Sequence, residues 1–268
     1  MGKTKIEWAR NKDGSEGMTW NPVRGCSRVS EGCRNCYAER MAARELPGMK
    51  SPTTGDPFAI MTPSGPRWTG KVELIESMLD IPLRRKKPTT YFVNSMSDLF
   101  HEALPDEVID RVFAVMALCP QHTFQLLTKR GERLLKYIAG KIGAGHRGDI
   151  VTAAMDQKFS LPRGRGFPRY VEAWPLPNVW LGVSVEDRAN KDRIDHLRAT
   201  PATVRFVSFA PLLEDLGELD LHAIDLAIWG GESGPGARPC DIAWVRRGME
   251  EADGDGCQSF VKQPARIL

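Results

Sequence analysis

The chain has 268 residues, of which 41% are hydrophobic and 26% charged, which excludes a disordered or fibrous protein and is typical of a soluble globular one. No run approaches the roughly 20 apolar residues of a membrane span, and the N-terminus lacks the apolar segment of a secretory signal. The net charge of +3 is too small to indicate a nucleic-acid partner, so we expect a cytoplasmic protein with reduced cysteines and no membrane partner.

Short apolar runs alternate with stretches of helical periodicity along the chain. A first strand is predicted near Met18–Asn21, just before a group of cysteines. The later predicted strands are Thr90–Asn94, Thr123–Thr128, Val179–Val185, Val204–Phe209, Leu226–Gly230 and Ser259–Lys262. The predicted helices are Asp106–Leu118, Glu132–Ile138, Arg188–Leu197 and Asp241–Glu251. Almost uninterrupted hydrophobic strands are typical of a parallel sheet that is buried on both faces.

This alternation predicts an α/β fold of parallel βαβ units. Six or seven units fit a partial or complete parallel (β/α) barrel better than a short open sheet, within a single domain over residues 1–268. Two segments interrupt the pattern. Residues 46–68 are rich in Pro, Gly, Ser and Thr, and residues 141–177 hold five glycines and four prolines. We expect the first to be a long excursion and the second a Gly/Pro-rich insertion or lid.

Three of the six cysteines lie within eleven residues. Cys26, Cys33 and Cys36 have the spacing C-x6-C-x2-C, which in a cytosolic protein indicates metal or redox chemistry rather than a disulfide. Gly25 and Gly32 precede two of them and allow a bulky inorganic group to approach the backbone. Three thiolates fit a [4Fe–4S] cluster that leaves one iron open to a chelating substrate or cofactor.

A structural zinc site is the alternative, in a nucleic-acid-binding or accessory protein. Zinc requires a fourth ligand, and His101, Cys119, Cys240 and Cys257 are available, although none has the spacing of a zinc finger. We interpret the three remaining cysteines as small buried hydrophobic residues and His101 as a buried, hydrogen-bonded histidine. A cluster without a substrate, in a redox-sensing protein, is a third possibility.

Polar residues follow the predicted strands at their carboxyl ends, where (β/α) barrels place their active sites. For any one of them the simple explanation is that loops are polar. Together they predict a binding site at one rim. The candidate residues are Asn94, Ser95, Thr128, Lys129, Arg130, Ser184, Glu186, Ser208, Gly231 and Glu232, with Ser233, Lys262 and Gln263 beside them.

Over nearly its whole length the chain resembles a phage and prophage protein family of unknown function that is described by a three-cysteine motif and related to radical S-adenosylmethionine (SAM) enzymes. The usual radical SAM motif is C-x3-C-x2-C with an aromatic residue before the third cysteine, whereas this chain has the longer first gap and Asn35. The resemblance is carried by Ile6–Trp8, Thr19–Pro22, Gly25–Cys26, Ser30, Gly32–Cys33, Cys36–Arg40, Phe92–His101, Leu127–Arg130, Pro177–Glu186 and Gly230–Pro239.

The resemblance implies a partial (β/α)6 barrel with the cluster loop after the first strand. SAM would chelate the open iron, and an electron donor such as a flavodoxin or ferredoxin would drive its cleavage. Lys129 or Arg130 would then suit the SAM carboxylate. Gly231 would allow a close approach to the backbone, and Glu232 would accept a hydrogen bond. The SAM ammonium or ribose would be bound by Asn94, Ser95, Ser184 and Glu186.

Two basic segments bear on a nucleic-acid substrate. Arg84–Lys87 is the densest run of positive charge, and we interpret it as a solvated face. The insertion interleaves basic and aromatic side chains, a pattern that can hold phosphates and stack on bases. These side chains are Arg163, Arg165, Phe167, Arg169 and Tyr170.

Overall fold

The computed structural model describes residues 2–4, 6–44, 48–143, 174–234 and 236–262. The elements follow the predicted alternation of strands and helices. In chain order they are β1 (Met18–Trp20), β2 (Val23–Arg24), η1 (Glu31–Cys33), α1 (Tyr37–Ala42), β3 (Ala59–Thr62), β4 (Gly65–Trp68), β5 (Glu73–Leu74), α2 (Glu76–Leu79), α3 (Ile81–Arg84), β6 (Thr90–Val93), α4 (Asp106–Ala117), β7 (Thr123–Thr128), α5 (Gly131–Gly143), β8 (Val179–Ser184), η3 (Arg188–Asn190), α7 (Asp192–Ala199), β9 (Val204–Phe209), β10 (Leu226–Trp229), α8 (Ile242–Gly254) and β11 (Gln258–Val261).

Seven strands form one parallel sheet in the order β1-β6-β7-β8-β9-β10-β11. The seven predicted strands match these within a residue or two. Within this sheet, each of the seven strands pairs with the one that follows it among the seven in chain order, as repeated βαβ units require. Between the edge strands β1 and β11 no pairing occurs in the described part of the chain. The sheet is therefore open, and the complete barrel among the predicted alternatives is not formed.

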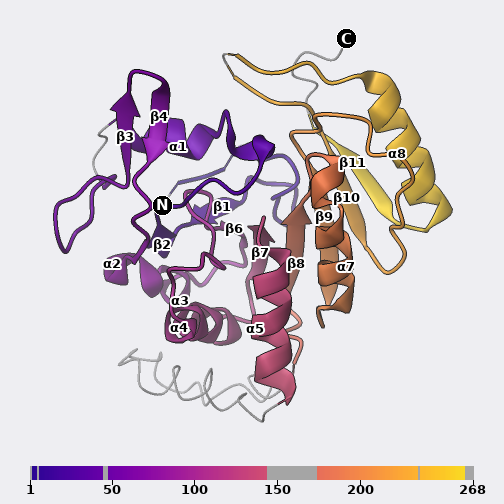
Figure 1. Ribbon diagram of the computed structural model, residues 1–268. Helices are drawn as coiled ribbons and strands as arrows, with labels where there is room; N and C mark the ends of the chain where they lie inside the picture. Colours follow the sequence, from indigo (N-terminus) through magenta and orange to yellow (C-terminus); the bar gives the residue numbers. More distant parts are fainter. Residues whose placement is uncertain (1, 5, 45–47, 144–173, 235, 263–268) are drawn as a thin grey trace.

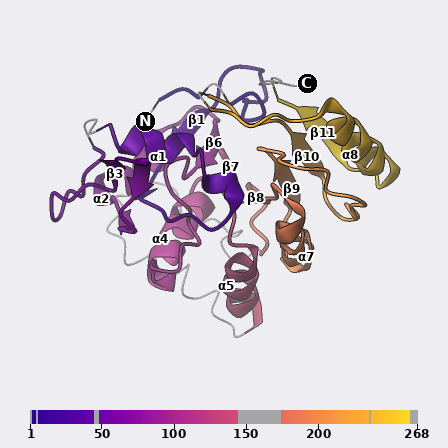
Figure 2. The same ribbon diagram turned by 45° about the horizontal axis from the view of Figure 1, so that its top comes forward.

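The main helices cover one face of the sheet. Figure 2 shows the strands as an arc with α4, α5, α7 and α8 along its outer side. Alternate residues of β8, namely Val179, Leu181 and Val183, are buried in the same core as Ile109 and Phe113 of α4. Each such large apolar side chain stabilises the fold by about 1.5–3 kcal/mol. Because right-handed crossovers between successive strands place every helix on the same side, the other face remains available for a site.

Trp8 lies against this second face, and its contacts show that the sheet is strongly rolled. Its ring is 5.0 Å from the Phe92 ring of β6 and 5.5 Å from the Phe206 ring of β9, centroid to centroid. The Lys262 ammonium, just beyond β11, is 5.9 Å from the same ring. In a flat sheet, with about 4.8 Å between strands, β6 would lie about 14 Å from β9 and about 24 Å from β11. One ring reaches all three only because the sheet curves around it, so we call this the concave face.

The two predicted excursions differ in outcome. Within residues 46–68 the chain forms the β3–β4 hairpin, which packs on α1 (Figure 1) around the buried residues Ala42, Ala59 and Met96. Of residues 141–177, the first three complete α5, and most of the rest, including the interleaved basic and aromatic residues, lies outside the described residues. The Arg84–Lys87 run is largely exposed, as predicted.

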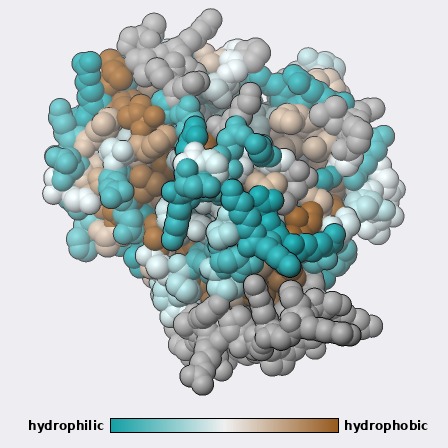
Figure 3. Space-filling view, turned by 180° about the vertical axis from the view of Figure 1, so that it is seen from behind, coloured by the Kyte–Doolittle hydropathy of each residue, from teal (hydrophilic) through white to brown (hydrophobic). Residues whose placement is uncertain are grey.

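None of the helices in the described residues combines the length and apolar character that crossing a membrane requires. Seen from behind, the molecule carries hydrophilic residues across its middle and hydrophobic residues in separate patches (Figure 3). The prediction that no helix spans a membrane is confirmed for this part of the chain.

Candidate metal and cofactor site

The cysteine loop follows β1 and lies over the carboxyl end of the sheet. Gly25 has a φ of +88° and forms a bridge to Ser97 in the loop after β6. A Cβ atom on Gly25 would lie 1.9 Å from the carbonyl oxygen of Lys71, so only glycine fits there. Cys33 ends η1, and Cys36 directly precedes α1. All three cysteines are thus placed by one loop that is fixed to its neighbours.

The three cysteines form no disulfide, and Cys33 is buried while Cys26 and Cys36 are partly buried. Burial, together with the nearby Asp98 carboxylate, raises the pKa of the Cys26 thiol to about 12. Burial also raises the pKa of Cys36. Cys33 and Cys36 act electrostatically on Cys26, so the three groups are neighbours. Without a metal, Cys26 and Cys36 are therefore neutral thiols, and binding a metal to them would release their protons.

Arg130 brings positive charge to Cys26. Its Nη1 atom is 4.0 Å from the Cys26 sulfur, and it donates to Asp98 at 3.0 Å. Its Nε atom donates to both oxygens of Glu102 at 2.9 Å. The Asp98 carboxylate also accepts hydrogen bonds from Thr128 and from the backbone of Lys129. Arg130 is therefore fixed beside the cysteine and can stabilise a thiolate there.

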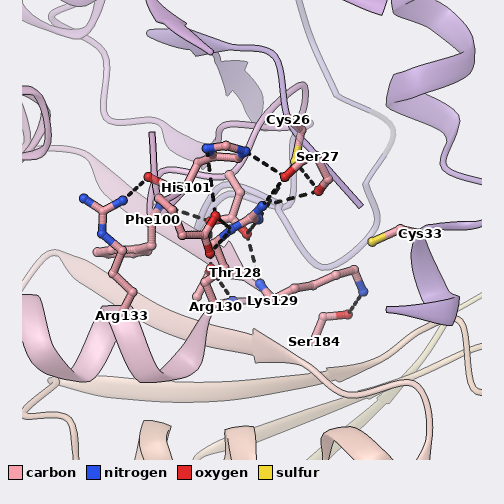
Figure 4. A network of polar contacts seen from close by, with 12 residues as sticks. Cys26, Ser27, Cys33, Phe100, His101, Thr128, Lys129, Arg130, Arg133 and Ser184 are labelled. Atoms are coloured by element: carbon pink, nitrogen blue, oxygen red, sulfur yellow. Dashed lines mark hydrogen bonds and ion pairs between the residues drawn. The ribbon is translucent and has the colours of Figure 1, made fainter. Parts of the chain in front are cut away.

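Ser27 links Arg130 to His101 in a network shown in Figure 4. The Ser27 hydroxyl lies 2.8 Å from His101 Nε2 and accepts from Arg130 Nη2 at 3.0 Å. His101 Nδ1 accepts the backbone N–H of Ala103, so in the neutral ring Nε2 carries the proton. Burial lowers the pKa of His101, which favours that neutral ring. Both ring nitrogens are engaged, which agrees with the expected buried, hydrogen-bonded histidine.

Glu186 is the centre of a second network, beside Cys33. Its side chain is fully buried and forms ion pairs with Lys129 and Arg193, the latter at 3.0 Å. The hydroxyl of Ser30 donates to it at 3.3 Å, as does that of Ser184. Burial lowers the pKa of Lys129 to about 8.

The two networks meet at Lys129. Its ammonium donates to the Ser184 hydroxyl at 2.9 Å, and the Cys33 sulfur points toward the same region (Figure 4). A Cβ atom on Gly32 would lie 2.3 Å from the Glu186 side chain. Gly32 therefore lets the cysteine loop pack directly on the end of β8.

The loop after β10 is tied to the cysteine loop by Glu232. Its carboxylate accepts from the Asn35 amide at 2.8 Å and from the backbone N–H and Nε of Arg238, each at 3.0 Å. Arg238 also donates to the Glu31 carbonyl at 3.0 Å. The predicted role of Glu232 was to accept a hydrogen bond from SAM, but its oxygens are used for this connection. Gly231 stands directly before it.

Two predicted residues at the strand ends have polar atoms without a partner among the described residues. Asn94 adopts a left-handed φ of 58°, its Oδ1 accepts the Val23 N–H at 3.4 Å, and its buried Nδ2 has no acceptor. The buried hydroxyl of Ser208 in β9, which pairs in register with Ser184, is also unsatisfied. Because such groups normally have partners, they suggest that a ligand belongs here. Ser95 instead donates to Asn21.

Three contributing residues were not predicted from the sequence. Asp98 lies within the Phe92–His101 motif and Ser27 directly follows the Gly25–Cys26 motif, but nothing in the pattern showed that they would meet. Arg193 lies in the predicted helix Arg188–Leu197 among other charged residues. Only its burial distinguishes it, and burial was not visible in the sequence.

The residues around the cysteines do not form a compact single-ion site. Within the described part of the chain, no group of three or more His, Cys, Asp or Glu side chains is arranged to hold one metal ion. Cys240 and Cys257, like Cys119, are buried in the main core, as expected of small hydrophobic residues. The cysteine loop therefore offers three thiols and no evident fourth zinc ligand.

Comparison with known proteins gives one match. A family model described as "Protein of unknown function (DUF5131)" matches residues 3–266. No curated protein and no solved structure matches the chain.

Proposed function

The chain belongs to the DUF5131 family of proteins of unknown function, so its activity is argued from its own site, and we propose that it is a radical SAM-type iron–sulfur enzyme. Cys26, Cys33 and Cys36 would hold a [4Fe–4S] cluster. The observation that carries the proposal is a set of three neighbouring thiols on one loop, with no fourth cysteine and no available histidine beside them among the described residues. A cluster with one open iron uses such a ligand set, whereas structural zinc requires four ligands.

The charges around the loop fit a cluster. Three thiolates on a cluster carry net negative charge, and the loop is lined by Arg130 beside Cys26 and by Lys129, on which Cys33 and Cys36 act electrostatically. Cys33 also interacts electrostatically with the Arg193 guanidinium. These cations would stabilise the thiolate form on binding of the metal. In the metal-free protein, Asp98 and Glu186 balance them.

The partnerless atoms at the strand ends fit SAM. The Asn94 amide can donate to its ribose or carboxylate, and the Ser208 hydroxyl can donate or accept. Lys129 or Arg130 would bind the SAM carboxylate, and either would do so by exchanging a present partner, which is Glu186 for Lys129 and Asp98 or Glu102 for Arg130. When bound, the cluster would supply one electron from a low-potential donor such as a flavodoxin or ferredoxin, which cleaves SAM and starts hydrogen abstraction from the substrate.

Anaerobic reconstitution with iron and sulfide, followed by SAM and dithionite, is expected to give 5′-deoxyadenosine and methionine. Product is measured by liquid chromatography and mass spectrometry, with reductant omitted as the control. A cluster that never cleaves SAM would reject the enzymatic part of the proposal. Protein that takes up about one zinc, and neither iron nor sulfide under anaerobic conditions, would support the zinc alternative.

Replacing Ser208 by alanine is expected to have opposite effects on stability and on ligand binding. Without SAM the variant should be more stable by about 1 kcal/mol, because an unsatisfied buried hydroxyl is removed. SAM should bind about tenfold more weakly, which corresponds to about 1.4 kcal/mol. Urea unfolding and equilibrium dialysis measure the two effects.

Ser184→Ala is the matched control for stability. The Ser184 hydroxyl accepts from Lys129 and donates to Glu186, so its removal should destabilise the ligand-free protein. If Ser208→Ala left SAM affinity unchanged, Ser208 would not belong to the cofactor site.

A further inference from the structure

Trp8 belongs to the Ile6–Trp8 motif, which the cysteine site does not use. Its ring lies on the concave face against Phe92 and Phe206. A Cβ atom on Gly182, opposite Phe206 in the sheet, would lie 2.5 Å from the Phe206 ring, so glycine makes room for this aromatic group. The main-chain carbonyl of Trp8 accepts a hydrogen bond from the Gln125 side-chain amide at 3.4 Å. The Ile6–Trp8 segment is thus fixed on the concave face. The cysteine loop lies over the carboxyl end of the same sheet.

Polar atoms around Trp8 lack partners among the described residues. The indole Nε1–H of Trp8 has no acceptor, and Oε1 of the buried Gln125 has no donor. Gln125 lies on the same face of the sheet as Phe92, with which it pairs directly in register. Buried polar groups of this kind are costly unless something binds to them. The concave face therefore presents an unused donor and an unused acceptor.

Lys262 adds a positive charge to the same place. Its ammonium lies over the Trp8 ring, 5.9 Å from the ring centroid. Burial lowers the pKa of Lys262 to about 8, while the Glu7 charge raises it, so the amine is still mostly protonated at pH 7. Gly230 leaves room for this side chain, since a Cβ there would lie 3.1 Å from the Lys262 Cβ. A partly buried ammonium can form a strong, charge-assisted hydrogen bond with a phosphate or carboxylate group.

We propose that Lys262 and Trp8 form a substrate subsite on the concave face, in which the ammonium binds a phosphate or carboxylate group of the substrate. The Trp8 N–H and the Gln125 carbonyl oxygen bind polar atoms beside that group. This names the substrate class of the proposed enzyme as an anionic organic molecule. It rests on that function, although the binding itself requires neither cluster nor SAM.

The test uses matched anionic and neutral probes on the full-length protein. Adenosine 5′-monophosphate is compared with adenosine, and benzoate with benzamide, by isothermal titration calorimetry at fixed ionic strength. At least one anion is expected to bind at least tenfold more tightly than its neutral counterpart. Tight binding of the monophosphate alone identifies a phosphate subsite, and tight binding of benzoate alone a carboxylate subsite.

Variants of Lys262 show whether this residue binds the anion. K262Q should remove the preference for the anion, and K262R should retain most of it. Lys136→Gln, at an exposed lysine paired with Glu132 on α5, is the control and should change nothing. If K262Q misfolds, the comparison of anionic with neutral probes on the unchanged protein still tests the proposal.

Equal binding of anion and neutral probe by the unchanged protein would overturn the proposal. So would an anion preference that survives in K262Q. Failure of SAM cleavage in a protein that retains this preference would reject the proposed enzyme and spare the subsite. SAM cleavage by a protein that shows no preference for the anion would support the proposed enzyme and reject the subsite.

Discussion

Replacing Cys33 by alanine is expected to abolish binding of the proposed iron–sulfur cluster. Anaerobically reconstituted wild-type protein should contain about four irons per chain and be brown, whereas the variant should be colourless and nearly iron-free. Two thiolates would leave two irons of the cluster unligated, and in the described part of the chain no histidine or further cysteine lies free beside the loop to replace the third. Iron and acid-labile sulfide analyses with visible absorption measure the loss. Cys26→Ala and Cys36→Ala should behave alike.

Cys257→Ala is the matched control for this substitution. Cys257 is 4% exposed in the main core, so the change should cost a little stability and leave the iron content at its wild-type value. Full iron content in Cys33→Ala would show that this residue is not a ligand. Loss of iron in Cys257→Ala, with the fold intact, would place the cluster elsewhere.

Replacing Glu186 by glutamine is expected to destabilise the metal-free protein by about 3–5 kcal/mol. The substitution keeps the shape of the side chain but removes the carboxylate that pairs with Lys129 and Arg193, and the latter is only 6% exposed. Two cations would then lie close together at a buried position without their counter-charge. The free energy of unfolding in urea measures the effect. Loading the cluster should restore part of the loss, because its negative charge lies beside the same cations.

Glu76→Gln provides the comparison at the surface. Glu76 forms a two-pronged pair with Arg111, with both contacts at 2.6 Å, but its side chain is 67% exposed. An exposed pair contributes about 0–1 kcal/mol, so this variant should unfold almost like the wild type. If both substitutions cost the same, Glu186 would not hold a buried charge network.

Strands and long helices were predictable because their sequence pattern and their burial have the same cause. The run Thr90–Val93 is buried at every position. A strand that is covered on both faces needs apolar residues at successive positions, so its sequence is a nearly continuous apolar run. The helix expected over Asp106–Leu118 agrees with α4 because its apolar spacing places Ile109 and Phe113 on the sheet. The placement of the cysteine loop after the first strand followed from the strand predicted near Met18–Asn21 and from the resemblance.

The detailed site could not be predicted in the same way, because its contacts join residues far apart in the chain. Glu232 was expected to bind SAM, but its charge is used by Arg238, and no periodicity indicates that pairing. Arg193 looks like any other charged helix residue until its burial beside Glu186 is known. The open sheet differs from a closed barrel in whether β1 and β11 pair, which depends on strand tilt and curvature rather than on residue type.

The position of Trp8 has a consequence for how the chain folds. This residue, near the start of the chain, completes the interior only when Phe206 and Lys262 have arrived, and Lys262 comes after the last strand. A nascent chain on the ribosome can form α4 and its neighbouring strands early, but it cannot finish packing around the indole until the segment that contains Lys262 has been synthesised. Contacts at such long sequence separation slow folding and leave apolar surface exposed meanwhile. The ring that contacts β6, β9 and the residue after β11 therefore makes the concave face one of the last parts of the fold to be completed.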